Sequence, residues 1–321
     1  METALALSRS CERMRARRPA VRASELPTRP SGRASGLKVL QVTDCHLFAS
    51  PAGRLRDMRT LDTLNAVLAQ ASEEARPDAI LATGDIAQEA HPTTYATFLA
   101  AVRARFDAPL LCVPGNHDSE PMLSSSLPVE PVTLASEKGG RGGAKERETG
   151  TEGDAPGGWR LVGIDTHIEG ETGGRTGSAV RERLARAIDS ANEHVLVAGH
   201  HAPVRIGTDW LDVHRIEDSD ELLACLGTQG SSRSPVRAYV FGHVHQAVDQ
   251  TRGPLRLLAS PSTCFQFRPK SAGFGVDDKP PGYRWLTLRA DGSLTTEVRW
   301  LEASHATNPI PPSEIHGKPQ R

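Results

Sequence analysis

Apolar and polar positions along the chain fall into two recurring patterns. Short apolar runs bounded by Gly, Pro or polar residues predict buried strands. These runs are residues 38–42, 78–83, 109–113, 159–165, 195–198, 236–241, 255–259, 283–289 and 295–301. Apolar residues spaced three and four positions apart predict helices at residues 61–74, 93–105, 180–188 and 221–226. Because strands and helices alternate, the sequence predicts an α/β fold with a mixed or parallel sheet covered by helices.

Three stretches lack both patterns and are predicted to lie outside the folded domain. The first 36 residues contain eight arginines against three acidic residues. This composition favours a disordered extension or a misassigned start site, with an amphipathic transit peptide as the alternative. Residues from about 135 to 158 are rich in Gly, Glu, Lys and Arg, which predicts a disordered insertion. Residues 305–321 form a polar tail, so the predicted domain spans residues 37–304.

Length, charge and cysteine content narrow the class of protein. A chain of 321 residues allows one large α/β domain or two small ones. A net charge of −1 gives no bulk attraction to nucleic acid or to an anionic membrane surface, and no apolar run reaches the length of a membrane-spanning helix. The five cysteines are odd in number and form no C-x-x-C pair. The unpaired cysteines favour a reducing compartment, so we expect a cytoplasmic protein. The net charge leads us to expect no nucleic-acid or membrane partner. The expected oligomeric state is a monomer or a homodimer.

The predicted strand at residues 109–113 ends in a Pro-Gly turn followed by three polar residues in a row. Asn116 offers a neutral oxygen ligand, His117 a nitrogen that binds a proton near pH 7, and Asp118 an acceptor for that histidine. Taken alone, an Asx turn with a surface histidine would explain the same residues.

Four other predicted strands end in the same way. Each of these endings has a simple explanation on its own, such as a Gly-Asp turn or a solvated Gly-His-x-His loop. In open α/β sheets, however, the carboxyl ends of the strands meet at the edge where ligands bind. Recurrence at five strand ends therefore favours one common site. Its candidate residues are Asp44 and His46, Asp85, Asn116 and His117, His200, and His243 and His245.

The side chains in this set are those that bind hard or borderline metal ions. Asp, Asn and His without a thiolate suit Mn²⁺, Fe²⁺ or Zn²⁺. Seven ligands are too many for one tetrahedral ion, but they suit two octahedral ions that share one carboxylate. Two ions about 3.5–4 Å apart can clamp a phosphoryl group during in-line attack. The set therefore predicts the hydrolysis of a phosphoester.

The strand-end residues resemble the complete motif set of the calcineurin-like metallophosphoesterases. The matching motifs are Asp44-x-His46, Gly84-Asp85, Gly115-Asn116-His117-Asp118, Gly199-His200 and Gly242-His243-x-His245. A narrower resemblance, to the bacterial class III 3′,5′-cyclic-AMP phosphodiesterases, comes from residues 257–267, Trp210-Leu211-Asp212-x-His214 and residues 281–298. The resemblance implies a four-layer α/β/β/α sandwich of the metallophosphoesterase type.

The same resemblance implies a role for each residue. Two divalent ions per chain, Fe²⁺ or Mn²⁺ with Zn²⁺ as the alternative, would share Asp85. A hydroxide between them would convert 3′,5′-cyclic AMP to 5′-AMP and so lower cellular cyclic AMP. His117 would act as proton donor or charge stabiliser, and Asp118 would orient it. The first ion would be bound by Asp44, His46, Asp85 and His245, and the second by Asp85, Asn116, His200 and His243. Substrate would contact His46, Asp85, Asn116, His117 and His245.

Three further residues are weaker candidates. His201 follows a predicted ligand, His214 belongs to the narrower resemblance, and Cys45 lies between two predicted ligands. For the two histidines a structural role is an equal alternative, and for Cys45 we expect simple packing.

Two other functions compete with cyclic AMP hydrolysis. The first is a dinuclear hydrolase of another phosphodiester or of a nucleotide pyrophosphate. The second is a binding module that keeps the fold but has lost its chemistry, which the absence of a ligand residue would favour. Every ligand position is filled in this sequence.

Overall fold

The computed structural model describes residues 36–135, 157–227 and 234–305. The predicted N-terminal extension, the predicted insertion and the predicted C-terminal tail fall outside these ranges, apart from the residues at their borders. Among the helices of the described ranges, none is both long enough and apolar enough to cross a lipid bilayer.

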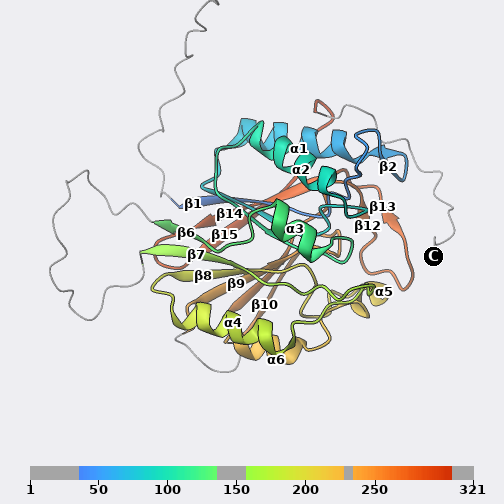
Figure 1. Ribbon diagram of the computed structural model, residues 1–321. Coiled ribbons are helices and arrows are strands. Elements are labelled where there is room, and N and C mark those ends of the chain that lie inside the picture. Colours follow the sequence, from blue (N-terminus) through green and yellow to red (C-terminus); the bar gives the residue numbers. More distant parts are fainter. Residues whose placement is uncertain (1–35, 136–156, 228–233, 306–321) are drawn as a thin grey trace, which may run out of the picture. The chain divides into compact units, whose positions relative to one another are not determined.

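The helices and strands lie as follows (Figure 1). The helices are α1 (Thr60–Glu74), α2 (Pro92–Arg103), α3 (Glu120–Ser126), α4 (Gly177–Asp189), α5 (Asp209–Asp212) and α6 (Ser219–Cys225). The longer strands are β1 (Leu37–Val42), β4 (Ala79–Thr83), β5 (Leu110–Val113), β6 (Val132–Ala135), β7 (Gly158–Gly163), β8 (His194–Ala198), β9 (Val236–Phe241), β10 (Val248–Arg252), β11 (Leu255–Ala259), β14 (Gly282–Leu288) and β15 (Leu294–Trp300). Two short hairpins pair β2 (Arg54–Leu55) with β3 (Met58–Arg59), and β12 (Gln266–Phe267) with β13 (Val276–Asp277).

The longer strands form two mixed sheets. The first has five strands in the order β15-β14-β1-β4-β5, and the second has six in the order β10-β11-β9-β8-β7-β6. The strands at the centre of each sheet run parallel, whereas β14, β15, β10 and β6 pair antiparallel with their neighbours. The alternation of strands and helices alone indicated one mixed or parallel sheet covered by helices, whereas the structure has the two sheets that the family resemblance implied.

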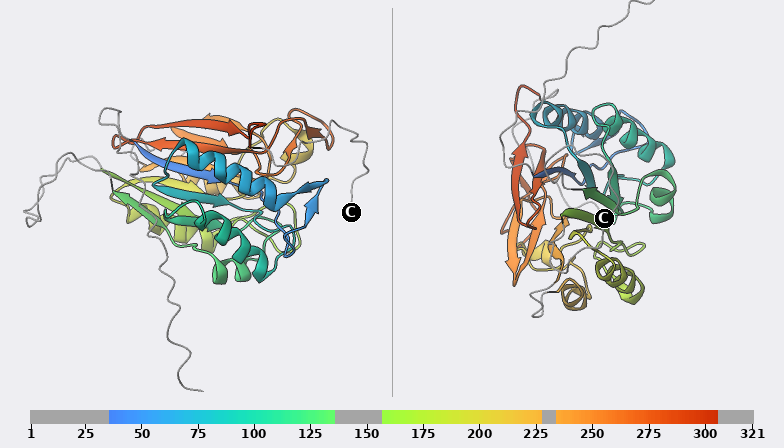
Figure 2. Two further views of the ribbon diagram at one scale, coloured as in Figure 1. Left: turned by 90° about the horizontal axis from the view of Figure 1, so that it is seen from above. Right: turned by 90° about the vertical axis from the view of Figure 1, so that its left-hand side faces the viewer.

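Strand side chains alternate between two apolar layers, which fixes how the sheets stack. Val39 and Leu81 of the first sheet pack against Leu196 and Val240 of the second, in a core that lies between the sheets. The neighbours of these residues on each strand point to the opposite face, where α1 and α2 cover the first sheet and α4 and α6 cover the second. The order is helix, sheet, sheet, helix, which confirms the predicted four-layer sandwich (Figure 2).

The start of helix α2 follows from local chemistry. At the start of α2, the His91 side chain accepts a hydrogen bond from the Thr93 N–H, and Pro92 occupies the first helical position. The segments that the sequence patterns missed are short or polar. Strand β10, for example, contains four polar or charged residues in its five positions because it lies at the edge of a sheet.

A buried arginine joins the two sheets at one end of the sandwich. The Arg284 guanidinium, on β14, donates to the carbonyl oxygens of Val248 and Ala259 on the second sheet at 3.0 and 2.6 Å. It also donates to Thr296 Oγ1 on β15 at 2.8 Å. The right-hand view of Figure 2 shows β14–β15 and β10–β11 beside one another at this end. The arginine thus fixes the strand that follows the predicted ligands His243 and His245.

Candidate metal centre

The predicted ligands come together because the strands end side by side. The Asp44 N–H donates to the Gly84 carbonyl, and the His46 N–H donates to the Asp85 carbonyl, at 3.0 and 2.9 Å. These bonds join the loop after β1 to the loop after β4. Across the sandwich, the His243 N–H donates to the Asp44 carboxylate at 3.1 Å. The two sheets therefore share one site at their carboxyl edges.

Backbone conformation sets these loops apart from the rest of the structure. Eight non-glycine residues in the described ranges have a positive φ, and five of them are predicted ligands. This left-handed conformation costs about 1–2 kcal/mol for each residue with a Cβ atom. Such strain persists at functional sites when the surrounding structure enforces it. The five ligands are Asp44, His46, Asp85, His243 and His245, with φ values of 46–65°.

Two glycines allow the loops to approach one another closely. A Cβ atom on Gly84 would lie 2.3 Å from Nδ1 of His200, and one on Gly115 would lie 2.2 Å from Oδ1 of Asp85. No side chain fits in either position. The glycine that precedes a ligand in these motifs therefore provides the space in which the ligand from another strand lies.

One cluster of ligand atoms consists of Asp44, His46, Asp85 and His245. The Nε2 atom of His245 lies 3.3 Å from Oδ1 of Asp44 and 3.1 Å from Nε2 of His46. The Nε2 atom of His46 lies 3.8 Å from Oδ2 of Asp85. All four side chains are buried. The set predicted for the first ion is therefore assembled in the structure.

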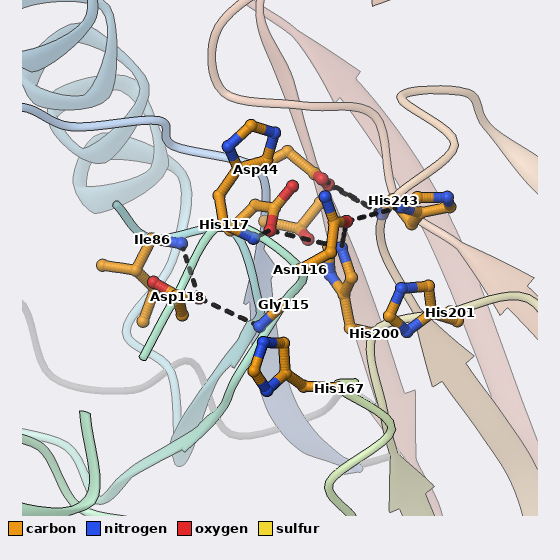
Figure 3. Close-up of polar contacts among 12 residues, drawn as sticks. Asp44, Ile86, Gly115, Asn116, His117, Asp118, His167, His200, His201 and His243 are labelled. Carbon is orange, nitrogen blue, oxygen red and sulfur yellow. Dashed lines mark hydrogen bonds and ion pairs between the residues drawn. The ribbon is translucent and has the colours of Figure 1, made fainter. Parts of the chain in front are cut away.

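The second cluster consists of Asp85, Asn116, His200 and His243. The Oδ1 atom of Asn116 lies 3.2 Å from Nε2 of His200 and 3.0 Å from Nδ1 of His243, and Figure 3 shows this amide pointing between the two rings. The Nε2 atom of His200 lies 3.5 Å from Oδ1 of Asp85. Asp85 thus directs one carboxylate oxygen to each cluster, as the predicted bridging role requires.

Backbone carbonyls fix the tautomers of two ligands. The Nδ1 atom of His245 lies 2.7 Å from the Phe265 carbonyl, and Nδ1 of His200 lies 2.8 Å from the Thr83 carbonyl. A carbonyl oxygen can only accept, so each Nδ1 atom holds a proton and Nε2 is the ring atom left for a metal ion. This is the usual arrangement behind metal-binding histidines. Burial lowers the pKa of His200, but the Asp85 carboxylate outweighs burial and raises that pKa to about 9, so a metal ion at this Nε2 would replace a proton.

The donor set fits two divalent cations. Burial lowers the pKa of His46 to about 3, so its ring is neutral and able to bind a metal. Burial alone would raise the pKa of Asp85, but the neighbouring His200 outweighs it and holds that carboxyl well below its ordinary range. The site therefore contains ionised carboxylates among buried histidines. In addition, Nε2 of His243 and Nδ1 of His46 are buried without a hydrogen-bond partner among the described residues.

His117 lies at the exposed side of the site. Its backbone N–H donates to Oδ1 of Asp85 at 2.9 Å, and its ring packs edge-on against His46 with the ring centroids 5.1 Å apart. The Nδ1 atom lies 3.3 Å from the Gln88 carbonyl oxygen and 3.4 Å from the Gln88 side-chain amide nitrogen, and these contacts leave Nε2 of His117 for a substrate. The location is compatible with the predicted role as proton donor.

Asp118 makes different contacts from those expected. Its carboxylate accepts hydrogen bonds from the backbone N–H groups of Ile86 and Gly115 at 3.2 and 3.0 Å (Figure 3). It also accepts one from the Ala87 N–H at 2.9 Å. Within the described residues it makes no hydrogen bond to the ring of His117. The expectation that Asp118 directly orients this ring is therefore corrected. The carboxylate instead holds together the two loops that present Asp85 and Asn116.

The weaker candidates are resolved by their contacts. His201 is buried beside His200 and His243, but its Nδ1 atom lies 2.8 Å from the Thr166 hydroxyl and its Nε2 atom 3.1 Å from the Thr172 carbonyl. With both ring nitrogens engaged, it supports the ligand rings rather than binding a metal. Cys45 is fully buried, as expected for packing.

A cavity of about 230 Å³ opens above both clusters. All five residues predicted to contact substrate line it. His214 and Trp210, from the narrower resemblance, also line it, together with Arg56 and Phe274, which the sequence patterns did not indicate.

The geometry can be compared with known proteins. A model of the family described as calcineurin-like phosphoesterase matches residues 37–247. The chain belongs to the calcineurin-like phosphoesterase family. Membership confirms the resemblance and the prediction of a hydrolytic enzyme. The match spans all seven predicted ligands, from Asp44 to His245.

Individual members of the family resemble the chain over most of its length. It is 40% identical over 271 residues to 3′,5′-cyclic adenosine monophosphate phosphodiesterase CpdA of Pseudomonas aeruginosa, with 84% of this chain and 91% of that protein covered. It is 35% identical over 283 residues to the protein of the same name from Escherichia coli (strain K12), with coverages of 86% and 94%. Among solved structures, GAP50, the anchor in the inner membrane complex of Plasmodium, has a TM-score of 0.52 at 12% identity over 84% of this chain and 86% of that chain. At this identity the likeness concerns the fold alone.

Two contributions to the site of this phosphoesterase could not be found from residue types. The first is the pair of backbone carbonyls, from Thr83 and Phe265, that hold a proton on Nδ1 of His200 and His245. The second is the wall of the cavity, which comes from short hairpins and from α5. The aromatic residues near position 265 were the available signal for this wall, but only the fold shows that they face the ligands.

Proposed function

We propose that this phosphoesterase hydrolyses 3′,5′-cyclic AMP to 5′-AMP with two bound divalent ions. The supporting observation is the carboxylate of Asp85, which directs one oxygen to each of two ligand clusters at the base of one cavity. The names of the relatives that are similar over most of the chain support the choice of substrate. The proposed ligands are Asp44, His46, Asp85, Asn116, His200, His243 and His245.

The oxygen and nitrogen donors of the two clusters favour Fe²⁺ or Mn²⁺, with Zn²⁺ as the alternative. When bound, two such ions would supply Lewis acidity and activate a water molecule for in-line attack on phosphorus. The side chains of the chain itself would position the phosphate. His46, Asp85, Asn116, His117 and His245 all line the cavity at the level of the clusters.

His117 would complete the reaction by protonating the leaving group. A new bond forms between phosphorus and the water oxygen while the bond from phosphorus to the 3′-oxygen breaks. The departing 3′-oxygen needs a proton, and Nε2 of His117 would donate it. The Nδ1 atom of this ring contacts the carbonyl oxygen and the side-chain amide of Gln88, so Nε2 is the ring nitrogen that is free to donate the proton.

We also retain the cytoplasm as the proposed location. The four cysteines in the described residues, Cys45, Cys112, Cys225 and Cys264, are free thiols. Free thiols are usual in a reducing compartment. The proposed partner is the small-molecule substrate, and the oligomeric state, monomer or homodimer, stays a prediction.

The test is the release of 5′-AMP from 3′,5′-cyclic AMP by metal-stripped protein, before and after addition of Mn²⁺ or Fe²⁺. Cyclic GMP, a generic chromogenic phosphodiester and a nucleotide pyrophosphate serve as comparison substrates. We expect metal-dependent turnover that is fastest on cyclic AMP. Turnover restricted to another ester would overturn the choice of substrate, and no turnover by folded, metal-loaded protein would favour a binding module.

A further inference from the structure

One side of the cavity consists of four aromatic side chains in mutual contact. We call Trp210, Phe265, Phe267 and Phe274 the aromatic wall. Phe267 stacks on the ligand His245 with ring centroids 4.4 Å apart. Phe267 also contacts Trp210 at 4.9 Å and Phe274 at 5.7 Å, between centroids. The wall therefore runs continuously from a metal ligand to the cavity mouth, where Phe274 is 43% exposed.

A cation lies over this wall. The guanidinium carbon of Arg56 is 4.7 Å from the ring centroid of Phe274 and 5.2 Å from that of Phe265. Arg56 also lines the cavity. It makes no ion pair or hydrogen bond to another residue in the described part of the chain. All its N–H donors are thus available to a ligand that lies against the wall.

Arg56 occupies a backbone position that does not suit it. It and Asp57 form the two-residue loop between β2 and β3, with φ values of 49° and 65°. Such a loop is a type I′ turn, in which Asn-Gly is strongly preferred because both residues need a positive φ. Arginine and aspartate are strained there. Strain of this kind indicates that the side chain serves a function that a relaxed turn would not provide.

Packing fixes the direction in which this turn points. Leu55 and Met58, one on each strand of the hairpin, pack against the cluster of Cys264, Phe265 and Val276. The hairpin is therefore held against the segment that provides part of the aromatic wall. Arg56 projects from the tip of a supported element, so its place over the wall follows from the fold.

We propose that the aromatic wall and Arg56 form the subsite for the purine base of the nucleotide. This inference rests on the proposed function, because it takes the phosphate to lie at the two clusters. From there a base can lie against the wall, since every nucleobase presents a flat face that stacks on aromatic rings. A guanidinium above the wall can stack on the base or donate to a ring nitrogen such as purine N7.

This subsite can be tested by comparing the binding of two phosphate esters, one that carries the purine base and one that lacks it. Calorimetry on the Mn²⁺-loaded protein compares 5′-AMP with ribose 5-phosphate. We expect 5′-AMP to bind roughly 5- to 150-fold more tightly, the range typical for stacking one base on an aromatic side chain. Arg56→Asn and Phe274→Ala should each reduce this preference several-fold and leave the affinity for ribose 5-phosphate unchanged.

Asp57→Gly is the matched control. Like Arg56→Asn it relaxes the turn, but it keeps the guanidinium, so it should preserve the preference for 5′-AMP. Arg56→Asn and Asp57→Gly should both have melting temperatures at or above that of the unaltered protein. This result would show that a loss of base binding is not caused by misfolding. Equal affinity of the unaltered protein for the two ligands would overturn the subsite. An equal loss of affinity for 5′-AMP and for ribose 5-phosphate in Arg56→Asn would also overturn the subsite.

Turnover of cyclic AMP, measured on the same samples, separates the two proposals. A preference for 5′-AMP that depends on Arg56, without turnover of cyclic AMP, would support the subsite and reject the proposed function. Turnover of cyclic AMP with equal affinity for 5′-AMP and ribose 5-phosphate would support the function and reject the subsite.

Discussion

The Nε2 atoms of His46 and His245 lie 3.1 Å apart in the buried part of the site. His245 presents a lone pair there, because its Nδ1 proton is directed to the Phe265 carbonyl. Two lone pairs cannot face one another at this distance, so either a neutral His46 donates its Nε2 proton to His245 or a cation lies between the two rings. Burial lowers the pKa of His46 to about 3, which disfavours an extra proton on that ring. A neutral His46 can therefore share a metal ion with His245 through Nε2, and the nearby carboxylates of Asp44 and Asp85 would supply negative charge.

Replacement of the bridging carboxylate should disable both ions together. In Asp85→Ala, each cluster loses the oxygen that faces it, so we expect loss of at least one bound ion and a fall in kcat of about 10³-fold or more. Elemental analysis and a turnover assay on the same sample measure both effects. Near-normal turnover with a normal metal content would show that Asp85 does not bridge.

Replacement of His117 should separate chemistry from metal binding. The ring lies at the exposed edge of the site, and its Nδ1 atom faces the Gln88 carbonyl. We expect His117→Ala to lower kcat by about 10²- to 10⁴-fold, the usual contribution of general acid catalysis. The metal content should stay unchanged. If the variant loses metal instead, His117 is itself a ligand.

Asp118 should strengthen metal binding, because it joins the two loops that present Asp85 and Asn116. Its carboxylate accepts from the N–H groups of Ile86, Ala87 and Gly115, whereas an asparagine has one acceptor oxygen and a competing NH₂ group. Asp118→Asn should therefore weaken metal binding by about 10- to 100-fold, as is typical when partners of metal ligands are changed. Titration with Mn²⁺ measures this change. The exposed Asp107→Asn serves as the control, and equal affinities in the two variants would rule out the positioning role.

Metal binding should stabilise the fold. Five ligands hold a left-handed backbone conformation that favours unfolding, and the bound ions offset this cost. At a free ion concentration 100 times the Kd, one bound ion adds about 2.7 kcal/mol to the free energy of unfolding. For a domain of this size the melting temperature should rise by roughly 5–10 °C. Thermal unfolding with Mn²⁺ and with a chelator measures the shift, and identical melting temperatures would argue against a native metal site.

Most of the site could be predicted from the sequence, because the ligands occur in short motifs directly after strands. Asp44 and His243 each follow the carboxyl end of a strand, but these strands belong to different sheets, so the two residues meet only because the sheets stack with these edges together. The division into two sheets was not predicted from periodicity. Strands such as β4 and β8 are buried on both faces, and a continuous apolar run does not indicate whether a helix or a second sheet covers each face.

The contacts around the ligands were harder to predict. The role assigned to Asp118 was wrong because adjacency in sequence suggested His117 as its partner, whereas a tight turn directs the carboxylate to backbone N–H groups. Arg56 gave no sequence signal, since its hairpin has only two residues in each strand and no Asn-Gly turn.

Stepwise addition of Mn²⁺ to the metal-stripped protein tests the central claim most directly. Cyclic AMP hydrolysis and bound metal are measured at each step. Two ions that share Asp85 should both be needed, so we expect two equivalents to bind and hydrolysis to appear mainly with the second. Full activity at one bound equivalent, or saturation of the protein by one ion, would contradict a dinuclear site.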